Sequence, residues 1–204
     1  HTGVGGDGVL VWHGPAASPT MTVINADGSL AAMCGNGLRC FVKYLLDRHV
    51  AGDWLTVDTG NGPLPCVARR GADGRVVEVR IGMGSPRWQF VDEELVGVRW
   101  TALSLGNPHA VTFSPVAAQA RLELGPQLCH HARFPDQANI GFARIDAPNH
   151  LALAVFERGC GWTQACGTGA TAAVLAATRL GLVERGVPVG VRLPGGRQRS
   201  TLQM

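Results

Sequence analysis

The sequence predicts an α+β fold of two similar lobes, because one pattern occurs twice along its 204 residues. In each half, strand-like runs lead to a Cys-Gly-x-Gly stretch, a helical run follows it, and further strands come next. The two stretches are Cys34-Gly35-Asn36-Gly37 and Cys166-Gly167-Thr168-Gly169. A polar stretch at 87–99 separates the halves, so we expect lobes of residues 1–95 and 96–204 with a ligand site between them.

Apolar runs bounded by turn residues predict the strands. In the first half these runs lie at 9–12, 21–24, 54–57, 64–68 and 76–81. In the second half we expect two strands around a sharp turn within 102–113, one at 151–156, and one that begins at 189–193. The stretch 87–99 is expected to be irregular.

Apolar residues at helical spacing predict one helix after each Cys-Gly-x-Gly stretch. The first is expected to end near Ala51-Gly52. The second is expected to run from about Gly167 to Leu180 and to stop at Gly181, a residue type that commonly ends helices.

Composition excludes several classes of protein. The net charge is +3 with no basic run, which gives no reason to expect a nucleic-acid partner. No apolar segment approaches the ~18 residues of a membrane span. The first residues lack the charged-then-apolar order of a signal peptide, so we expect a cytoplasmic protein. The 6 cysteines are then expected to be free thiols, and without a C-x-x-C motif a structural metal site is disfavoured.

Two cofactor hypotheses fail on the sequence. Lys43 is the single lysine and lies within the first predicted helix, which disfavours a pyridoxal-phosphate Schiff base. Gly3, Gly5 and Gly8 satisfy G-x-G-x-x-G, but a dinucleotide fingerprint needs a strand before it and a helix after it. Here a strand follows and nothing precedes, so we expect only a glycine-rich turn.

The two cysteines at predicted helix starts are candidates for acid–base chemistry. A helix N-terminus carries partial positive charge and unpaired N–H groups, so it favours a thiolate and attracts a carboxylate. Inverting an amino-acid α-carbon needs a base on one face and an acid on the other, which a thiolate and a thiol can supply. We expect Cys34 and Cys166 to face each other across one substrate, although either alone could be a packed helix-entry residue.

Other polar residues have simpler readings when taken singly. Asn25, Asn107 and Asn139 lie at turns between strands, where asparagine is common for conformational reasons. Arg158 beside Glu157 is compatible with a surface ion pair. A histidine at position 109 is compatible with an ordinary loop residue.

Six segments, in the same order, resemble those of diaminopimelate epimerases and together cover nearly the whole chain. They are Asn25-Ala26-Asp27-Gly28-Ser29, Cys34 to Cys40, Gly106-Asn107-Pro108-His109, Phe134-Pro135 with Asn139, Glu157-Arg158-Gly159, and Ala165 to Ala170. The resemblance implies two pseudo-symmetric lobes, each a curled, mostly antiparallel sheet around a central helix. It further implies a cofactor-independent homodimer that interconverts LL- and meso-diaminopimelate for lysine and cell-wall synthesis.

The resemblance also implies roles for individual residues. Cys34 and Cys166 would be the acid–base pair, and His109 and Glu157 would tune the protonation of the thiols. The substrate's distal end would be held by Asn25, Asn107, Asn139 and Arg158, and the reacting carboxylate by the backbone of Gly35, Asn36, Gly167 and Thr168. Glu157 would also contact the substrate.

The chain departs from the family pattern at two positions and at its ends. Gly8 stands where many members have glutamine, and Trp162 stands where the residue is often acidic or small. The family's N-terminal strand would precede His1, and its last strands would follow Met204. The alternatives are a two-cysteine racemase of another amino acid, such as histidine or proline, and a non-catalytic thiol protein that binds ligands or senses redox state.

Overall fold

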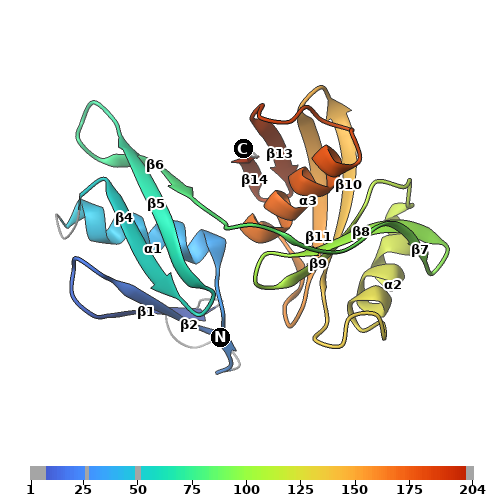
Figure 1. The fold of residues 1–204 in the computed structure, drawn as a ribbon, viewed down its shortest axis with the longest axis horizontal. Coiled ribbons are helices and arrows are strands. Elements are labelled where there is room, and N and C mark those ends of the chain that lie inside the picture. Colours follow the sequence, from blue (N-terminus) through green and yellow to red (C-terminus); the bar gives the residue numbers. More distant parts are fainter. Residues whose placement is uncertain (1–7, 26–27, 49–51, 201–204) are drawn as a thin grey trace. The chain divides into compact units, whose positions relative to one another are not determined.

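A computed structural model describes residues 8–25, 28–48 and 52–200 of the chain. The chain divides into two compact units, His1–Gly84 and Ser85–Met204 (Figure 1). Each unit contains a sheet and at least one helix packed against it, so the predicted α+β class is confirmed. The division falls after Gly84, whereas the sequence suggested a boundary after residue 95.

The first unit is a six-stranded sheet packed on one helix. Its path runs β1-β2-β4-β5-β6, and β3 pairs with β2 beside that path. Within the path the pairings are antiparallel except for the parallel contact between β2 and β4. The elements are β1 (Gly8–His13), β2 (Thr20–Asn25), β3 (Leu30–Ala31), α1 (Gly35–Asp47), β4 (Trp54–Thr59), β5 (Gly62–Arg70) and β6 (Val76–Ile81).

Helix α1 is amphipathic, as the sequence predicted. Its buried residues include Leu38, Val42 and Leu45, which form one apolar core with the inner faces of β2, β4 and β5. The helix ends at Asp47 with Arg48 as C-cap, earlier than the expected stop near residues 51–52, of which 51 lies outside the described residues. A helix can therefore end without the glycine that the sequence suggested.

The second unit is an eight-stranded sheet with helices on both faces. Its path runs β14-β13-β11-β10-β9-β8-β7, with β12 paired to β11. Two contacts are parallel, β9 with β10 and β11 with β13. The elements are β7 (Arg87–Leu95), β8 (Val98–Ser104), β9 (Pro108–Thr112), α2 (Ala118–Cys129), β10 (Asn139–Ala147), β11 (His150–Glu157), β12 (Gly161–Thr163), α3 (Gly167–Arg179), β13 (Val189–Leu193) and β14 (Gly196–Ser200).

The two helices of the second unit form separate apolar cores on opposite sides of the sheet (Figure 1). Helix α3 buries nearly every side chain, because alanines let β9, β10, β11 and β13 approach it closely. Helix α2 covers the other face through Leu124, Leu128 and Cys129, which pack on Trp100 and Phe142. Of these two helices, α3 is the central helix that the family resemblance implied for this lobe.

Residues 87–99, expected to be irregular, form β7 and the start of β8. The pairing is interrupted by register shifts between Trp88 and Phe90 and between Phe90 and Glu93. Asp92 and Val96 also adopt positive φ angles of 55° and 53°. These irregularities break the period-two pattern by which a strand is recognised in a sequence.

The glycine-rich segment at Gly3, Gly5 and Gly8 can be described only in part. Gly3 and Gly5 lie outside the described residues, and Gly8 begins β1. A Cβ atom at Gly8 would lie 2.5 Å from the carbonyl oxygen of Ile24 on the paired strand. A side chain at this position would therefore require β1 to shift.

Membrane-spanning helices were sought over the same described residues. Within them, no helix combines the length and apolar character needed to cross a bilayer.

Candidate active site

Cys34 and Cys166 are both N-cap residues, the first of α1 and the second of α3. Their backbone angles nearly coincide, with φ −129° and ψ 110° at Cys34 and φ −134° and ψ 110° at Cys166. Each sulfur accepts a hydrogen bond from the backbone N–H three residues later, at 3.3 Å in both cases. The helix N-terminus thus offers each thiol an N–H donor and a positive field.

The second glycine of each Cys-Gly-x-Gly stretch is required by close packing. A Cβ atom at Gly169 would lie 3.1 Å from the sulfur of Cys166 and 3.2 Å from Cγ2 of Val155. At Gly37 the corresponding atom would lie 3.3 Å from the sulfur of Cys34 and 2.9 Å from Cδ2 of Leu10. In both units the glycine therefore lets the capping sulfur lie against the first helical turn.

The surroundings of Cys166 favour its protonated form. The residue is only 4% exposed, and its sulfur lies 3.6 Å from the hydroxyl oxygen of Thr168. Burial and the negative charge of Glu157 raise the pKa of the Cys166 thiol to about 12, against hydrogen bonds from Thr168 and Gly169 that lower it. The hydroxyl of Thr163 donates to Oε1 of Glu157 and so fixes that carboxylate.

His109, Asn107 and Thr168 form a hydrogen-bonded chain that reaches Cys166. Nε2 of His109 lies 3.2 Å from Oδ1 of Asn107, and Nδ2 of Asn107 donates to the Thr168 hydroxyl at 3.4 Å. Burial, and to a lesser extent the charge of Arg158, lower the pKa of His109 to about 3. A neutral imidazole that donates from Nε2 satisfies this network, which makes His109 an orienting group for Asn107.

Asn139 connects the strands that carry the other site residues. Its Oδ1 accepts the backbone N–H of Arg158 at 3.0 Å, and its Nδ2 donates to the carbonyl of Pro108 at 3.3 Å. The residue is 4% exposed and lies in register with His109 on the neighbouring strand. Both polar atoms of this side chain thus bind backbone groups, at a residue that the family resemblance assigns to the distal end of the substrate.

Arg158 follows directly after β11 and is exposed to solvent. Its Nη1 donates to the backbone carbonyl of Asp136 at 2.8 Å. The second unit thus brings together Cys166, Gly167, Thr168, Asn107, His109, Asn139, Glu157 and Arg158 in one connected network.

The first unit carries the remaining site residues, which the sequence also predicted. Gly35 and Asn36 open α1, and Oδ1 of Asn36 accepts a hydrogen bond from Arg39 at 3.2 Å. Asn25 ends β2, where its Nδ2 donates to the hydroxyl of Ser29 at 3.0 Å. The sequence indicated a turn at residues 25–28, of which residues 26 and 27 lie outside the described residues.

Sequence reasoning missed three residues that act on these groups. Thr163 holds Glu157, the Asp136 carbonyl holds Arg158, and Arg39 lies among the cysteines of the first unit. Burial lowers the pKa of the Arg39 guanidinium, and the charges of Cys34, Cys40 and Cys66 oppose that effect. A single signal was available for Arg39, which follows Asn36 at the i,i+3 spacing of helical neighbours.

A metal-binding group is not apparent in the part of the chain that the structure describes. Among those residues, no three His, Cys, Asp or Glu side chains gather as ligands of one ion would.

Comparison with solved structures identifies the fold. A probable proline racemase from Agrobacterium radiobacter K84 matches with a TM-score of 0.77 at 18% identity, over 96% of this chain and 67% of that one. A hydroxyproline epimerase from Agrobacterium vitis matches with a TM-score of 0.76 at 18% identity, over 97% and 66% of the two chains. The chain thus has the fold of these racemase and epimerase structures, which confirms the predicted fold.

Sequence comparison identifies the particular family. The sequence model of the diaminopimelate epimerase family matches residues 1–89 and 101–204. The diaminopimelate epimerase of Azotobacter vinelandii is 40% identical, over 97% of this chain and 76% of the relative. That of Bacteroides thetaiotaomicron is 42% identical, over 91% and 71% of the two chains. The chain belongs to the diaminopimelate epimerase family.

Proposed function

We propose that this chain interconverts LL- and meso-diaminopimelate, with Cys34 and Cys166 as the acid–base pair. The observation that carries the proposal is the matched N-cap geometry of two cysteines in separate units. Relatives that are about 40% identical carry the name of that enzyme, and chains of the same fold are described as racemases and epimerases. The reaction is an isomerisation, so it needs a proton removed from one face of a carbon and one returned to the other.

The proposed reaction requires one protonated and one deprotonated thiol at its start. A pKa of about 12 keeps Cys166 as a thiol at neutral pH, so it is the proton donor of the resting chain. Cys34 is then the proposed base that removes the α-proton. After turnover the roles are exchanged, and the reverse reaction starts from that state.

The two helix N-termini support the charge that develops on the substrate. The backbone N–H groups at the helix starts, those of Gly35 and Asn36 and those of Gly167 and Thr168, are suited to bind the reacting α-carboxylate. As the α-proton leaves, negative charge spreads onto this carboxylate and is stabilised by those groups. His109 keeps the amide of Asn107 oriented and does not exchange protons at neutral pH.

We propose that Arg158 binds the distal end of the substrate, with Asn25, Asn107 and Asn139 as further candidates. A guanidinium binds a carboxylate through two parallel hydrogen bonds, which gives geometric selectivity as well as affinity. We further propose a cytoplasmic homodimer as the working form, as the family resemblance implies.

Solvent isotope incorporation tests the proposal. In D₂O, the chain should introduce deuterium at the α-carbon of diaminopimelate. Cys34→Ala and Cys166→Ala should each lower epimerisation by about 10²–10⁴-fold, since each removes one member of an acid–base pair. Cys160→Ser is the matched control, because Cys160 is also a cysteine outside any disulfide in the described structure, is exposed, and does not belong to the proposed acid–base pair. Full turnover in either alanine variant would exclude a mechanism with two cysteines.

A racemase of another amino acid is the second candidate, favoured by the proline racemase and hydroxyproline epimerase structures that share the fold. Isotope incorporation into proline or histidine, with none into diaminopimelate, would select it. A chain that exchanges no amino acid but is reversibly modified by oxidants at the same cysteines would instead be a thiol-based sensor.

A further inference from the structure

The turn after β11 brings Thr163 back beside Glu157. The chain reverses between Glu157 and Gly161, with positive φ angles of 78° at Gly159 and 75° at Gly161. Glycine adopts such angles without strain, and the N–H of Cys160 donates to the carbonyl of Glu157 at 3.2 Å. Strand β12 therefore runs back along β11, and Thr163 lies two residues beyond Gly161, the strand partner of Glu157.

The alternation of side chains along β11 decides which face of the sheet Thr163 occupies. Thr163 lies opposite Val155. Val155 is buried in the core that contains α3 and Cys166, whereas the next residue, Phe156, packs on the core that contains α2. Successive side chains of a strand point to opposite faces, so Glu157 shares the face of Val155. Thr163 and Glu157 therefore both lie on the face that carries Cys166.

The Glu157 carboxylate interacts with both Thr163 and Cys166. The hydroxyl of Thr163 donates to Oε1 of Glu157 at 2.5 Å. Burial first, and then the charge of Glu157 and its hydrogen bond with the thiol, raise the pKa of Cys166 to about 12. A carboxylate accepts hydrogen bonds at both oxygens, so one donor can fix its orientation while the thiol is the other. The effect of Glu157 on Cys166 thus depends on how the carboxylate is held.

A second element anchors the strand that carries Thr163. The backbone N–H of Gly195, in the turn between β13 and β14, donates to the carbonyl of Gln164 at 2.7 Å. A Cβ atom at Gly195 would lie 2.9 Å from that carbonyl oxygen, so a glycine permits this close approach. Thr163, the residue before Gln164, is therefore held by two elements, β11 and this turn. Its hydroxyl is a fixed donor for Glu157.

We propose that Thr163 is a positioning residue of the reaction, whose hydroxyl holds the Glu157 carboxylate against Cys166 and so sets how strongly that sulfur retains its proton. In one direction Cys166 gives its proton to the α-carbon, and in the other its thiolate removes the α-proton. Thr163 and Glu157 keep their own protonation states throughout, and the fixed carboxylate makes the thiolate a stronger base. The inference rests on the proposed function and deepens it, since it assigns a support to one member of the acid–base pair.

Alkylation of Cys166 tests this positioning without any substrate. Thr163→Val keeps the β-branched shape but lacks the donor, so the carboxylate can turn away and the pKa of Cys166 should fall. Iodoacetamide should then modify Cys166 faster at pH 8, by roughly tenfold for each unit of pKa, as measured by peptide mass spectrometry. Thr163→Ala should match Thr163→Val, and Thr163→Ser, which keeps the hydroxyl, should react at the wild-type rate.

A double-mutant cycle shows whether Thr163 acts through Glu157. In a Glu157→Gln chain the charge that Thr163 positions is already absent, so adding Thr163→Val should change the alkylation rate less than about twofold. The same acceleration with and without Glu157→Gln would instead indicate looser packing around Cys166, and it would overturn the inference.

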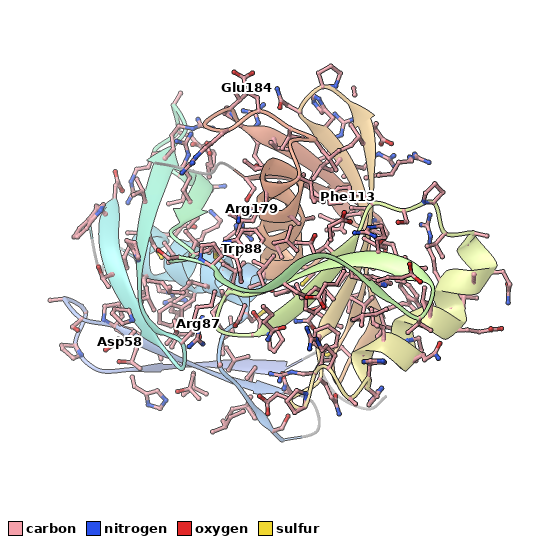
Figure 2. All side chains as sticks on the ribbon, turned by 45° about the vertical axis from the view of Figure 1, so that its right-hand side comes forward. Asp58, Arg87, Trp88, Phe113, Arg179 and Glu184 are labelled. Carbon is pink, nitrogen blue, oxygen red and sulfur yellow. The ribbon has the colours of Figure 1, made fainter. Side chains whose placement is uncertain are left out.

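The pH profile of epimerisation provides the second test. The alkaline limb of kcat/KM reports loss of the proton from the acid of the resting chain, here Cys166, so in Thr163→Val it should begin at lower pH. At neutral pH kcat should fall about tenfold with KM changed less than about threefold, and Thr163→Ser should retain most of the activity. Thr178→Val is the matched control, because its hydroxyl donates to the carbonyl of Val174 near the far end of α3, where Figure 2 labels the adjacent Arg179.

The outcomes separate this inference from the proposed function. Wild-type alkylation and a wild-type pH profile in Thr163→Val, in a chain that epimerises diaminopimelate, would overturn the role of Thr163 and leave the function standing. An equal loss of activity at every pH, with no rescue by Thr163→Ser, would show a structural defect and also contradict that role. A wild-type chain that incorporates no deuterium into diaminopimelate would overturn the proposed function together with the catalytic role of Thr163, even where the alkylation rates show its action on Cys166.

Discussion

Cys34 and Cys166 occupy equivalent helix N-caps but lie in different surroundings. Their backbone angles agree within 5°, and each sulfur accepts a hydrogen bond from the backbone N–H three residues later, at 3.3 Å. Yet Cys34 is half-buried, with Arg39 nearby, whereas Cys166 is almost fully buried and lies beside the carboxylate of Glu157. The N-cap thus positions both thiols alike, and the neighbouring charges make the two sites different.

Helices α1 and α3, which follow the two cysteines, also differ in how deeply they are buried. Helix α1 has one buried face and an opposite face where Lys43 pairs with Asp47 at 2.8 Å. Helix α3 is enclosed on nearly all sides by strands and is rich in alanine. We therefore expect changes near Cys166 to have larger effects than matched changes near Cys34.

The largest expected difference is the sensitivity of the second unit to acid. The folded pKa of His109, about 3, lies below its usual value of 6.5, so its contribution to stability is complete above pH 6.5 and is lost as the pH falls toward 3. The full window corresponds to several kcal/mol. Amide hydrogen exchange in β9 and β10 should show this loss, and His109→Gln should reduce it.

The exposed His150 supplies the control for that measurement. His150→Gln should leave the acid sensitivity of β9 and β10 unchanged. If His109→Gln and the wild-type chain lost protection in parallel between pH 6.5 and pH 4, the buried imidazole would not be the cause.

Substituting the matched glycines provides the next comparison. Gly169→Ala places a methyl group against Cys166 and Val155 inside a dense core, which should cost about 1–3 kcal/mol of the free energy of unfolding. Gly37→Ala should cost less, because the closest atom is the end of the Leu10 side chain, which is only partly buried. Urea unfolding of the two variants measures the difference, and equal losses would contradict the contrast in packing.

The negative charge of Glu157 beside Cys166 can be removed while the shape of the Glu157 side chain is kept. Glu157→Gln should lower the pKa of the Cys166 thiol, since it deletes a negative charge that raises it. Iodoacetamide should then modify Cys166 faster at pH 8, by roughly tenfold for each unit of pKa. Peptide mass spectrometry resolves this rate from those of the other cysteines. Glu184→Gln, at an exposed acid of the same unit, should leave the rate unchanged.

The smallest expected effect concerns the hydrogen bonds of the first helical turns. Thr168→Val leaves Nδ2 of Asn107 without its acceptor and should cost about 1 kcal/mol. Asn36→Ala removes the acceptor of Arg39, but that guanidinium retains access to water and the cost should be smaller. Thermal unfolding of both variants compares them, and a larger loss for Asn36→Ala would reverse the contrast.

The sequence predicted those parts of the fold in which local signals agree. Both main helices begin where a cysteine precedes glycine, and their apolar residues follow helical spacing. Helix α2 lacked such agreement, because Gly125 and Pro126 interrupt it and its apolar residues do not form a clear stripe. Strand β7 was missed because its bulges break the alternation.

The residues of the candidate site could likewise be predicted only in part from the sequence. The sequence indicated the residues that lie within short local motifs, such as Cys166 and Arg158. The residues that act on them lie on neighbouring strands, so their placement depends on strand pairing and register, which the motifs do not encode. Thr163 reaches Glu157 through the pairing of β12 with β11, and Arg87 lines a cavity beside Arg158 through the pairing of β7 with β8.

The side chain of Trp162 lies against Gly125 between α2 and the sheet of the second unit. The indole stacks near Phe142 and Phe156, at centroid distances of 5.9 and 5.6 Å. A Cβ atom at Gly125 of α2 would lie 3.2 Å from both Phe156 and Trp162. A larger residue at 125 therefore demands a smaller one at 162, and substitutions at these two positions should rescue each other when they exchange bulk.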